Sequence, residues 1–287
     1  MAKELFPNKI IWLASYPKSG NTWFRAFLSA LMGGGEVEIN SMKTDGIFSS
    51  REIFEIITDI DSHDLYDEEV KLMLPSVYRQ LAAERKQTQI VKVHDAYSFN
   101  KDSEPLIPAD VTHCAVYIIR NPLDVVASLA NHNGTTIDQA IDLMNNKEGC
   151  LAYQRNNLNI ASQLRQLMYD WSSHVISWTR VTDFPVYVIR YEDMLGDSLS
   201  SFSRVLDAIG WNYSQEKIKT AVDASSFDKL SKQEKEKGFF EKNKKTSRFF
   251  RSGSSGNWVN ELTEAQAKKI LLAHKKVMEQ YEYVINL

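Results

Sequence analysis

One short loop near the start of the chain gathers residues that can hold a phosphate or sulfate group. Residues 15–23 (Ser-Tyr-Pro-Lys-Ser-Gly-Asn-Thr-Trp) join an apolar run to a helical pattern. A turn of small residues at such a junction exposes backbone N–H groups beside the positive end of the helix, which suits an anion. The loop adds one full charge and three side-chain donors, from Lys18, Ser19, Asn21 and Thr22. It differs from the nucleotide loop Gly-x4-Gly-Lys-Ser/Thr, because its lysine precedes its one glycine, Gly20. A loop of this kind, taken alone, is also typical of a solvated surface turn.

A lysine and a histidine near the end of a short alternating segment have the side chains needed for polar catalysis. Residues 89–94 (Gln-Ile-Val-Lys-Val-His) alternate at period two, so Lys92 and His94 share one face of a predicted strand. The carboxyl ends of strands are where open α/β sheets bind ligands. Imidazole titrates near neutral pH, so His94 can act as a general base beside the charge of Lys92. The alternative is the wet polar face of an edge strand.

Further basic and small polar residues follow at two later places in the chain. Arg120 ends an apolar run and Ser128 lies two turns into the following helix, so both could meet one anionic group; an ion pair and a helix-packing role are the alternatives. Residues 251–258 (Arg-Ser-Gly-Ser-Ser-Gly-Asn-Trp) form a second loop of anion-binding composition. The preceding residues 232–251 hold eight Lys/Arg against three Glu. This basic run predicts a lid over an anionic ligand, with a solvated face as the alternative.

The elements that must position these residues alternate between strands and helices. Compact or alternating apolar segments predict strands at residues 9–15, 89–94, 114–119 and 185–191. Helical spacing and capping signals predict helices at residues 23–31, from 121 onward, at 158–180, at 199–209 and from 263 onward. Residues 228–256 give only a weak helix or loop signal. The alternation predicts one α/β domain over residues 1–287, with a central, mostly parallel sheet flanked by helices and with residues 232–256 as a mobile basic lid.

Composition and charge narrow the class of protein. The 287 residues are 43% hydrophobic and carry a formal net charge of −3, which argues against a nucleic-acid binder. No apolar run approaches the roughly 18–20 residues of a membrane span, and the first residues lack the apolar segment of a secretory signal. The two cysteines, Cys114 and Cys150, form neither a disulfide framework nor a metal-binding pattern. We therefore expect a cytoplasmic enzyme.

Taken in this order and spacing, the segments resemble the cytosolic-type sulfotransferase family, which uses 3′-phosphoadenosine 5′-phosphosulfate (PAPS). The resemblance rests on five motifs: Tyr-Pro-Lys-Ser-Gly-Asn-Thr-Trp, Lys-Val-His, Arg-Asn-Pro-Leu-Asp-Val-Val-Ala-Ser, Tyr-Glu-Asp-Met and Arg-Ser-Gly-Ser-Ser-Gly-Asn-Trp. It implies a P-loop-like fold and in-line transfer of the sulfuryl group to a hydroxyl or amine of a small molecule, without a metal. The product nucleotide would be 3′,5′-bisphosphoadenosine (PAP).

The resemblance also implies a role for each matching residue. The 5′-phosphosulfate loop would consist of Lys18, Ser19, Gly20, Asn21, Thr22 and Trp23. The 3′-phosphate would be held by Arg120, Ser128, Arg251 and Gly253. The adenine would contact Trp23, Tyr191, Ser225 and Phe227. His94 would be the catalytic base, Lys92 would steady the sulfuryl oxygens, and Lys18 would meet the charge that grows on the bridging oxygen.

The sequence departs from the family pattern at several positions. Ser252 stands where the family has a lysine, and Asn257 where an aspartate is common. Only Thr263 of the family's short dimerisation motif is kept, so the oligomeric state stays open. A P-loop-type kinase of small molecules and a non-catalytic nucleotide-binding protein on the same fold are the alternatives. The acceptor-lining stretches, 36–85 and 130–160, carry no readable signature.

Overall fold

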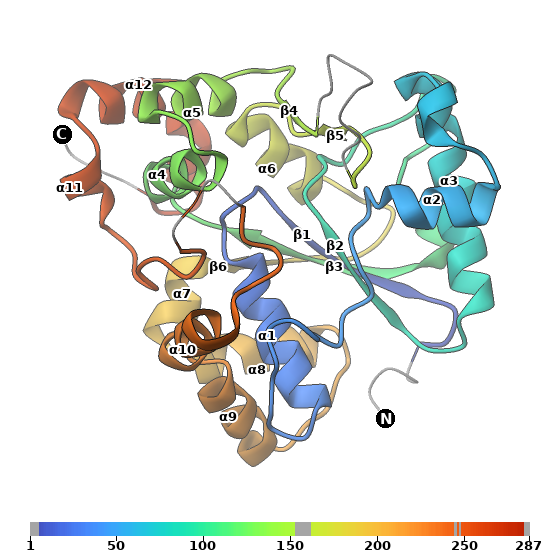
Figure 1. Cartoon of the computed structure of the whole chain (residues 1–287), viewed down its shortest axis with the longest axis horizontal. Coiled ribbons are helices and arrows are strands. Elements are labelled where there is room, and N and C mark those ends of the chain that lie inside the picture. The colour runs from blue at the N-terminus through green and yellow to red at the C-terminus, as the bar shows by residue number, and fades with distance from the viewer. Residues whose placement is uncertain (1–5, 153–161, 244–245, 247, 284–287) are drawn as a thin grey trace. The chain divides into compact units, whose positions relative to one another are not determined.

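The computed structural model describes residues 6–152, 162–243, 246 and 248–283 (Figure 1). Its main sheet has four strands in the order β2-β1-β3-β6, and β4 and β5 form a small antiparallel pair. The strands are β1 (Ile10–Ser15), β2 (Gln89–Val93), β3 (Thr112–Ile119), β4 (Cys150–Leu151), β5 (Gln166–Leu167) and β6 (Val186–Arg190). The pairing of β1 with β2 is parallel. The predicted α/β class with a central parallel sheet is confirmed.

Helices connect and follow these strands. Those before β4 are α1 (Asn21–Met32), α2 (Arg51–Thr58), η2 (Ser62–Asp64), α3 (Asp67–Glu84), η3 (Ala109–Val111), α4 (Pro122–Asn133) and α5 (Ile137–Met144). Those after β5 are α6 (Trp171–Thr179), α7 (Tyr191–Gly196), α8 (Ser198–Ala208), α9 (Gln215–Ala224), α10 (Phe227–Lys237), α11 (Trp258–Glu261) and α12 (Glu264–Gln280).

The chain divides into two compact units, each assembled from three segments. The first unit comprises Met1–Tyr16, Asp45–Tyr117 and Lys147–Val188. The second unit comprises Pro17–Thr44, Ile118–Asn146 and Ile189–Leu287. Strands β3 and β6 each pass from the first unit into the second near their carboxyl ends. The prediction of one domain over residues 1–287 stays a prediction.

Aromatic side chains fasten helices to strands in the first unit. Trp12 of β1 meets Tyr78 of α3 edge to face, with ring centroids 5.1 Å apart, and both rings are fully buried. Tyr117 of β3 stacks on Trp178 of α6 at 6.3 Å. Aromatic pairs of this geometry add to the stability gained by burying their area, so α3 and α6 are fixed to the strands that carry Trp12 and Tyr117.

The second unit contains two groups of helices. In one, α1 packs on α9, which packs on α8 (Figure 1). The ring of Phe27 on α1 stacks on that of Phe202 on α8, with centroids 4.2 Å apart. In the other, α4 packs against α5, α11 and α12. The capping signals are confirmed: Asn121 caps α4 through the N–H of Leu123, and Thr263 forms the expected capping box.

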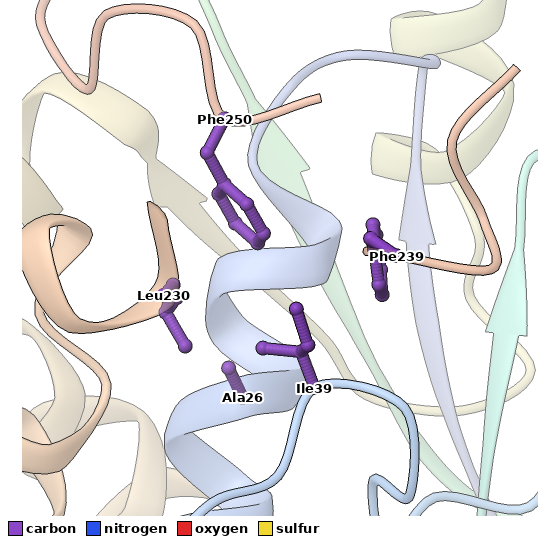
Figure 2. Close-up of a cluster of buried hydrophobic side chains, with 5 residues drawn as sticks. All are labelled: Ala26, Ile39, Leu230, Phe239 and Phe250. Atoms are coloured by element: carbon purple, nitrogen blue, oxygen red, sulfur yellow. The ribbon is translucent and has the colours of Figure 1, made fainter. Parts of the chain in front are cut away.

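A small apolar cluster in the second unit anchors part of the predicted lid. Figure 2 shows Phe239 and Phe250 gathered beside α1 with Ala26, Ile39 and Leu230. Of the two possibilities left open by the weak helix or loop signal, residues 227–237 form a helix, α10. The basic run therefore also contains two phenylalanines, Phe239 and Phe250, that are buried in an apolar cluster and that the charge count did not show. Mobility of the segment itself stays a prediction.

The helix predicted at residues 158–180 is largely wrong. Among the described residues of this range only α6 is helical, and residues 158–161 lie outside the description. Leu167 belongs to β5, where it pairs with Cys150 of β4. Tyr169 has a φ of 56°, and Asp170 caps α6 by accepting from the Ser173 N–H, so the helix begins only at Trp171.

Candidate functional site

The loop after β1 turns sharply at two residues before α1 begins. Lys18 has a φ of 69° and Gly20 a φ of 105°. A Cβ on Gly20 would lie 2.6 Å from Cδ2 of Tyr191, closer than side-chain atoms pack. Glycine is therefore required at position 20 by both its backbone conformation and the neighbouring ring. The turn leaves Asn21 and Thr22 as the buried first residues of α1, and their predicted contact with an anion stays a prediction.

The guanidinium of Arg120 ties this loop to the loop near the end of the chain. Nη1 donates to the carbonyl of Lys18 and Nη2 to the carbonyl of Ser254, each at 3.1 Å. The same guanidinium lies over the ring of Tyr191, 4.2 Å from its centroid. Arg120 is only 9% exposed, so these contacts are partly shielded from water. One side chain thus joins three segments that are distant in the sequence.

The carboxylate of Asp124 binds the last residues of the second loop, within 255–258. Its carboxylate accepts from the N–H of Gly256 at 2.8 Å, the hydroxyl of Ser255 at 3.0 Å and the N–H of Trp258 at 3.1 Å. The residue is 3% exposed. These contacts could not be predicted from the sequence, because the partners of Asp124 lie more than 130 positions along the chain. A buried carboxylate with these three donors fixes the path of residues 255–258.

Aromatic rings and glycines meet closely in the same unit. Trp23 meets Tyr191 edge to face at 5.7 Å. Gly253 has a φ of 59°, and a Cβ there would lie 2.4 Å from the ring of Phe227. The predicted adenine-binding residues Trp23, Tyr191 and Phe227 are therefore each in contact with another ring or with a predicted loop residue.

Phe249 is a contact of Lys18 that sequence reasoning missed. The ammonium of Lys18 lies 4.0 Å from the centroid of the Phe249 ring. The backbone N–H groups of Phe249 and Phe250 donate to the carboxylate of Glu234, at 2.6 and 2.9 Å. The pair of phenylalanines directly before Arg251 was the available sequence signal.

Three other predicted residues lie in the same unit without joining these contacts. Ser128 is half-buried on α4. Ser225 is fully buried and donates its hydroxyl to the carbonyl of Ala221 at 2.8 Å, so that proton is committed to the end of α9. Arg251 forms an ion pair with Glu261, with Nη1 and Oε2 2.8 Å apart. Their predicted roles stay predictions.

Among the predicted anion-binding residues, the buried atoms Oγ of Ser19 and Nε of Arg120 have no hydrogen-bond partner within the described part of the chain. Most buried polar groups in proteins are paired, because an unpaired one costs free energy. A donor-rich loop with such atoms fits an anionic ligand.

The first unit contains the other two predicted residues, Lys92 and His94. His94 directly follows β2, and β2 runs parallel to β1 with Val93 opposite Ala14. Nδ1 of His94 lies 2.9 Å from the carbonyl oxygen of Ser15 and 3.3 Å from its hydroxyl. Because a carbonyl can only accept, the neutral imidazole carries its proton on Nδ1 and its lone pair on Nε2.

Lys92 is fixed through its backbone by a neighbouring segment. Its N–H donates to the carbonyl of Gly46 at 3.0 Å, and its carbonyl accepts from the N–H of Phe48 at 2.7 Å. Its side chain is half-buried, as is that of His94, and that the two share one face stays a prediction. The next residue after His94, Asp95, is buried, and burial raises the pKa of its carboxyl to about 8.

The Sulfotransferase domain model matches residues 8–282. This chain belongs to the sulfotransferase family. It is 25% identical to Sulfotransferase 1B1 of Canis lupus familiaris, over 95% of this chain and 84% of the relative, and 25% identical to Cytosolic sulfotransferase 13 of Arabidopsis thaliana, over 91% and 74%. The predicted family and the predicted sulfotransferase activity class are confirmed, and the comparisons give no support to the kinase alternative.

Solved structures show the same fold at lower identity. Mouse sulfotransferase SULT7A1 complexed with PAP is 17% identical, with a TM-score of 0.58 over 97% of this chain and 88% of that one. Retinol dehydratase in complex with androsterone and PAP is 20% identical, with a TM-score of 0.60 over 96% and 82%. The predicted P-loop-like α/β fold is that of these proteins.

The described residues can also be compared with two other kinds of site, a membrane span and a metal centre. None of the helices described is both long and apolar enough to cross a membrane. One trio of side chains, Glu55, Asp61 and His63, brings ligand atoms within 4.8 Å of one another. The trio lies at α2 and η2 and includes none of the predicted site residues. That the reaction needs no metal stays a prediction.

Proposed function

We propose that this sulfotransferase moves the sulfuryl group of PAPS to a hydroxyl or amine of a small molecule, with His94 as the general base. The observation that carries the proposal is the hydrogen bond between Nδ1 of His94 and the carbonyl of Ser15. By holding the ring proton on Nδ1, it gives Nε2 the lone pair that accepts the proton of the acceptor. A general base contributes about 10²–10⁴ to the rate.

The second unit would hold the nucleotide. The loop from Lys18 to Trp23 would bind the 5′-phosphosulfate, where the unpartnered hydroxyl of Ser19 and the turn at Gly20 fit an anion. The 3′-phosphate would be held by Arg120, Ser128, Arg251 and Gly253. The adenine would contact Trp23, Tyr191, Ser225 and Phe227. When bound, PAPS supplies the sulfuryl group and leaves as PAP, the ligand named for the two solved relatives.

The remaining work of the chain is electrostatic. Lys18 would stabilise negative charge at the bridging oxygen and Lys92 negative charge on the sulfuryl oxygens. Sulfuryl transfer requires mainly positioned reactants and stabilised charge, so lysines, arginines and backbone N–H groups suffice and no metal is proposed. The acceptor would be a small metabolite in the cytoplasm rather than a nucleic acid or a membrane component.

A transfer screen tests this function. The protein is incubated with [³⁵S]PAPS and a panel of phenols, alcohols and amines, and labelled products are separated from the donor. We expect transfer to at least one acceptor, inhibited by added PAP, and binding of PAP in calorimetry without any acceptor. Binding of PAP with no transfer to any acceptor would favour the non-catalytic alternative. Absence of PAP binding would contradict the proposal that PAPS is the donor.

A further inference from the structure

One face of α6 holds the backbone that follows His94. His174, Ser177 and Trp178 are spaced at i, i+3 and i+4, so they share a side of the helix. Nε2 of His174 lies 3.0 Å from the carbonyl oxygen of His94, and Nε1 of Trp178 donates to the carbonyl of Asp95 at 3.0 Å. The hydroxyl of Ser177 accepts from the N–H of Tyr97 at 3.1 Å. Three side chains of one helix thus bind three backbone groups of one four-residue turn.

His174 also has a partner on its other nitrogen. The Tyr117 hydroxyl lies 2.9 Å from Nδ1 of His174, which is fully buried. Burial lowers the pKa of His174 to about 4, so the ring is neutral near pH 7. The carbonyl of His94 can only accept, so His174 carries its proton on Nε2 and accepts from Tyr117 on Nδ1. Both ring nitrogens are satisfied in one tautomer.

A buried histidine costs free energy unless its ring nitrogens are hydrogen-bonded, and an apolar ring avoids that cost altogether. An apolar aromatic residue would fill the same volume beside Tyr16 and Tyr117, whose rings contact His174 at 5.3 and 5.8 Å. Only a donor at Nε2 can bind the carbonyl of His94. That bond and the Ser15 bond fix the backbone and the ring of His94 from two directions.

We propose that His174 is a positioning residue for His94, holding its backbone so that its ring keeps the Nδ1–H bond to Ser15. This inference rests on the proposed role of His94 as the base. Misplacing a catalytic group by about 1 Å can cost roughly 100-fold in rate, which gives such a residue a measurable effect.

Two substitutions separate the hydrogen bonds from the packing. His174→Phe keeps an aromatic ring and removes both bonds, whereas His174→Gln retains a donor and an acceptor. His274→Phe is the matched control, because His274 is a second buried histidine, on α12 of the second unit. Calorimetric titration with PAP gives the concentration of folded, nucleotide-binding protein for each variant.

The first readout needs no acceptor. In protein labelled with [¹⁵N]histidine, the ring nitrogens of His94 report its tautomer. We expect the wild type and H174Q to show one tautomer with the proton on Nδ1, and H174F to show a mixture. An unchanged His94 ring spectrum in folded H174F would overturn the inference, whatever the activity of the protein.

The second readout is turnover with [³⁵S]PAPS and 4-nitrophenol. We expect H174F to lower kcat about 10- to 100-fold with the KM for PAPS unchanged, and H174Q to recover to within about threefold of wild type. In the His94→Ala background, H174F should cause no further loss, because it acts through His94. A full extra loss there, or an equal loss in H274F, would contradict a positioning role. Wild-type turnover in H94A would instead refute the proposed base, and the ring spectrum would still decide the role of His174.

Discussion

The loops around Arg120 and the turn after His94 both join segments that are distant in the sequence, yet they are held by different groups. In the second unit, a guanidinium and two carboxylates bind backbone carbonyls and N–H groups, from Arg120, Asp124 and Glu234. In the first unit, the turn after His94 is held by an imidazole, an indole and a hydroxyl, all neutral near pH 7. The proposed nucleotide side is organised by charge and the proposed base by neutral hydrogen bonds.

This difference separates how the two regions respond to salt, pH and substitution. The guanidinium of Arg120 also offers its positive charge to an anionic ligand, so its removal should affect binding and depend on salt. Neutral anchors offer only geometry, so their removal should affect the rate and leave binding unchanged. The predictions below would sharpen or break this division.

Removal of the base should have the largest effect. We expect His94→Ala to lower kcat by about 10²–10⁴, with PAP binding close to that of the wild type, because the predicted nucleotide residues all lie in the second unit. Steady-state kinetics and calorimetry measure the two quantities separately. His132, in the last turn of α4 one turn beyond Ser128, is the alternative base, and His132→Ala should keep the wild-type rate. If H94A kept more than about half of the rate, His94 would not be the base and His132 would become the candidate.

Removal of the charged clamp should act on binding. Arg120→Ala should weaken PAP binding by about 10- to 150-fold, the worth of a charge-assisted hydrogen bond to a buried phosphate. Binding of adenosine 5′-phosphosulfate, which lacks the 3′-phosphate, should fall much less in calorimetry. Arg120→Lys keeps the charge but cannot reach both the Lys18 and Ser254 carbonyls, so it separates charge from clamping. Equal losses for both ligands would show that Arg120 acts only as a loop clamp.

The sequence predicted the four strands of the main sheet and the local capping signals. The compact run before the first loop, the cap at Asn121 and the capping box at Thr263 are features of short segments, and each appears where the pattern placed it. The predicted loop residues also fall into one unit. Motifs of this kind can be read because neighbouring residues determine the local backbone.

Long-range anchors could not be predicted. Asp124 binds residues about 130 positions away, and Glu234 binds two N–H groups within a run that charge counting described as basic. The apolar spacing within residues 158–180 predicted a helix, although Leu167 pairs in β5. A pattern of residue types does not show which distant backbone group a buried polar side chain will meet.

The neutral region makes a prediction about stability. Asp95 has a pKa raised by burial from 3.8 to about 8, so folding opposes its ionisation and stability falls as pH rises between these values. His174, with a lowered pKa of about 4, costs stability as pH falls from 6.5, which offsets Asp95 below pH 6.5. Between pH 6.5 and 8, the unfolding free energy of the wild type should fall by about 1.5 kcal/mol through Asp95, and Asp95→Asn should not show this fall. Urea titrations at several pH values measure the unfolding free energy of the two proteins. Asp207→Asn, at an exposed position, is the control. If the pH profiles of D95N and the wild type were parallel, Asp95 would be ionised in the folded protein.

The smallest effect should come from the exposed edge of the charged region. Arg251 pairs with Glu261 at 2.8 Å, and a partly exposed pair of this kind is worth about 0.2–1 kcal/mol. If Arg251 binds the 3′-phosphate, Glu261 competes with that phosphate, and Glu261→Gln should tighten PAP binding about two- to fivefold. The gain should shrink at high salt, because screening weakens both partners of Arg251. Glu264→Gln removes one negative charge nearby without touching the pair and should leave the affinity unchanged. Weaker PAP binding in E261Q would mean that the ion pair holds the loop in its binding conformation. Arg251 would then stabilise the loop and not bind the 3′-phosphate.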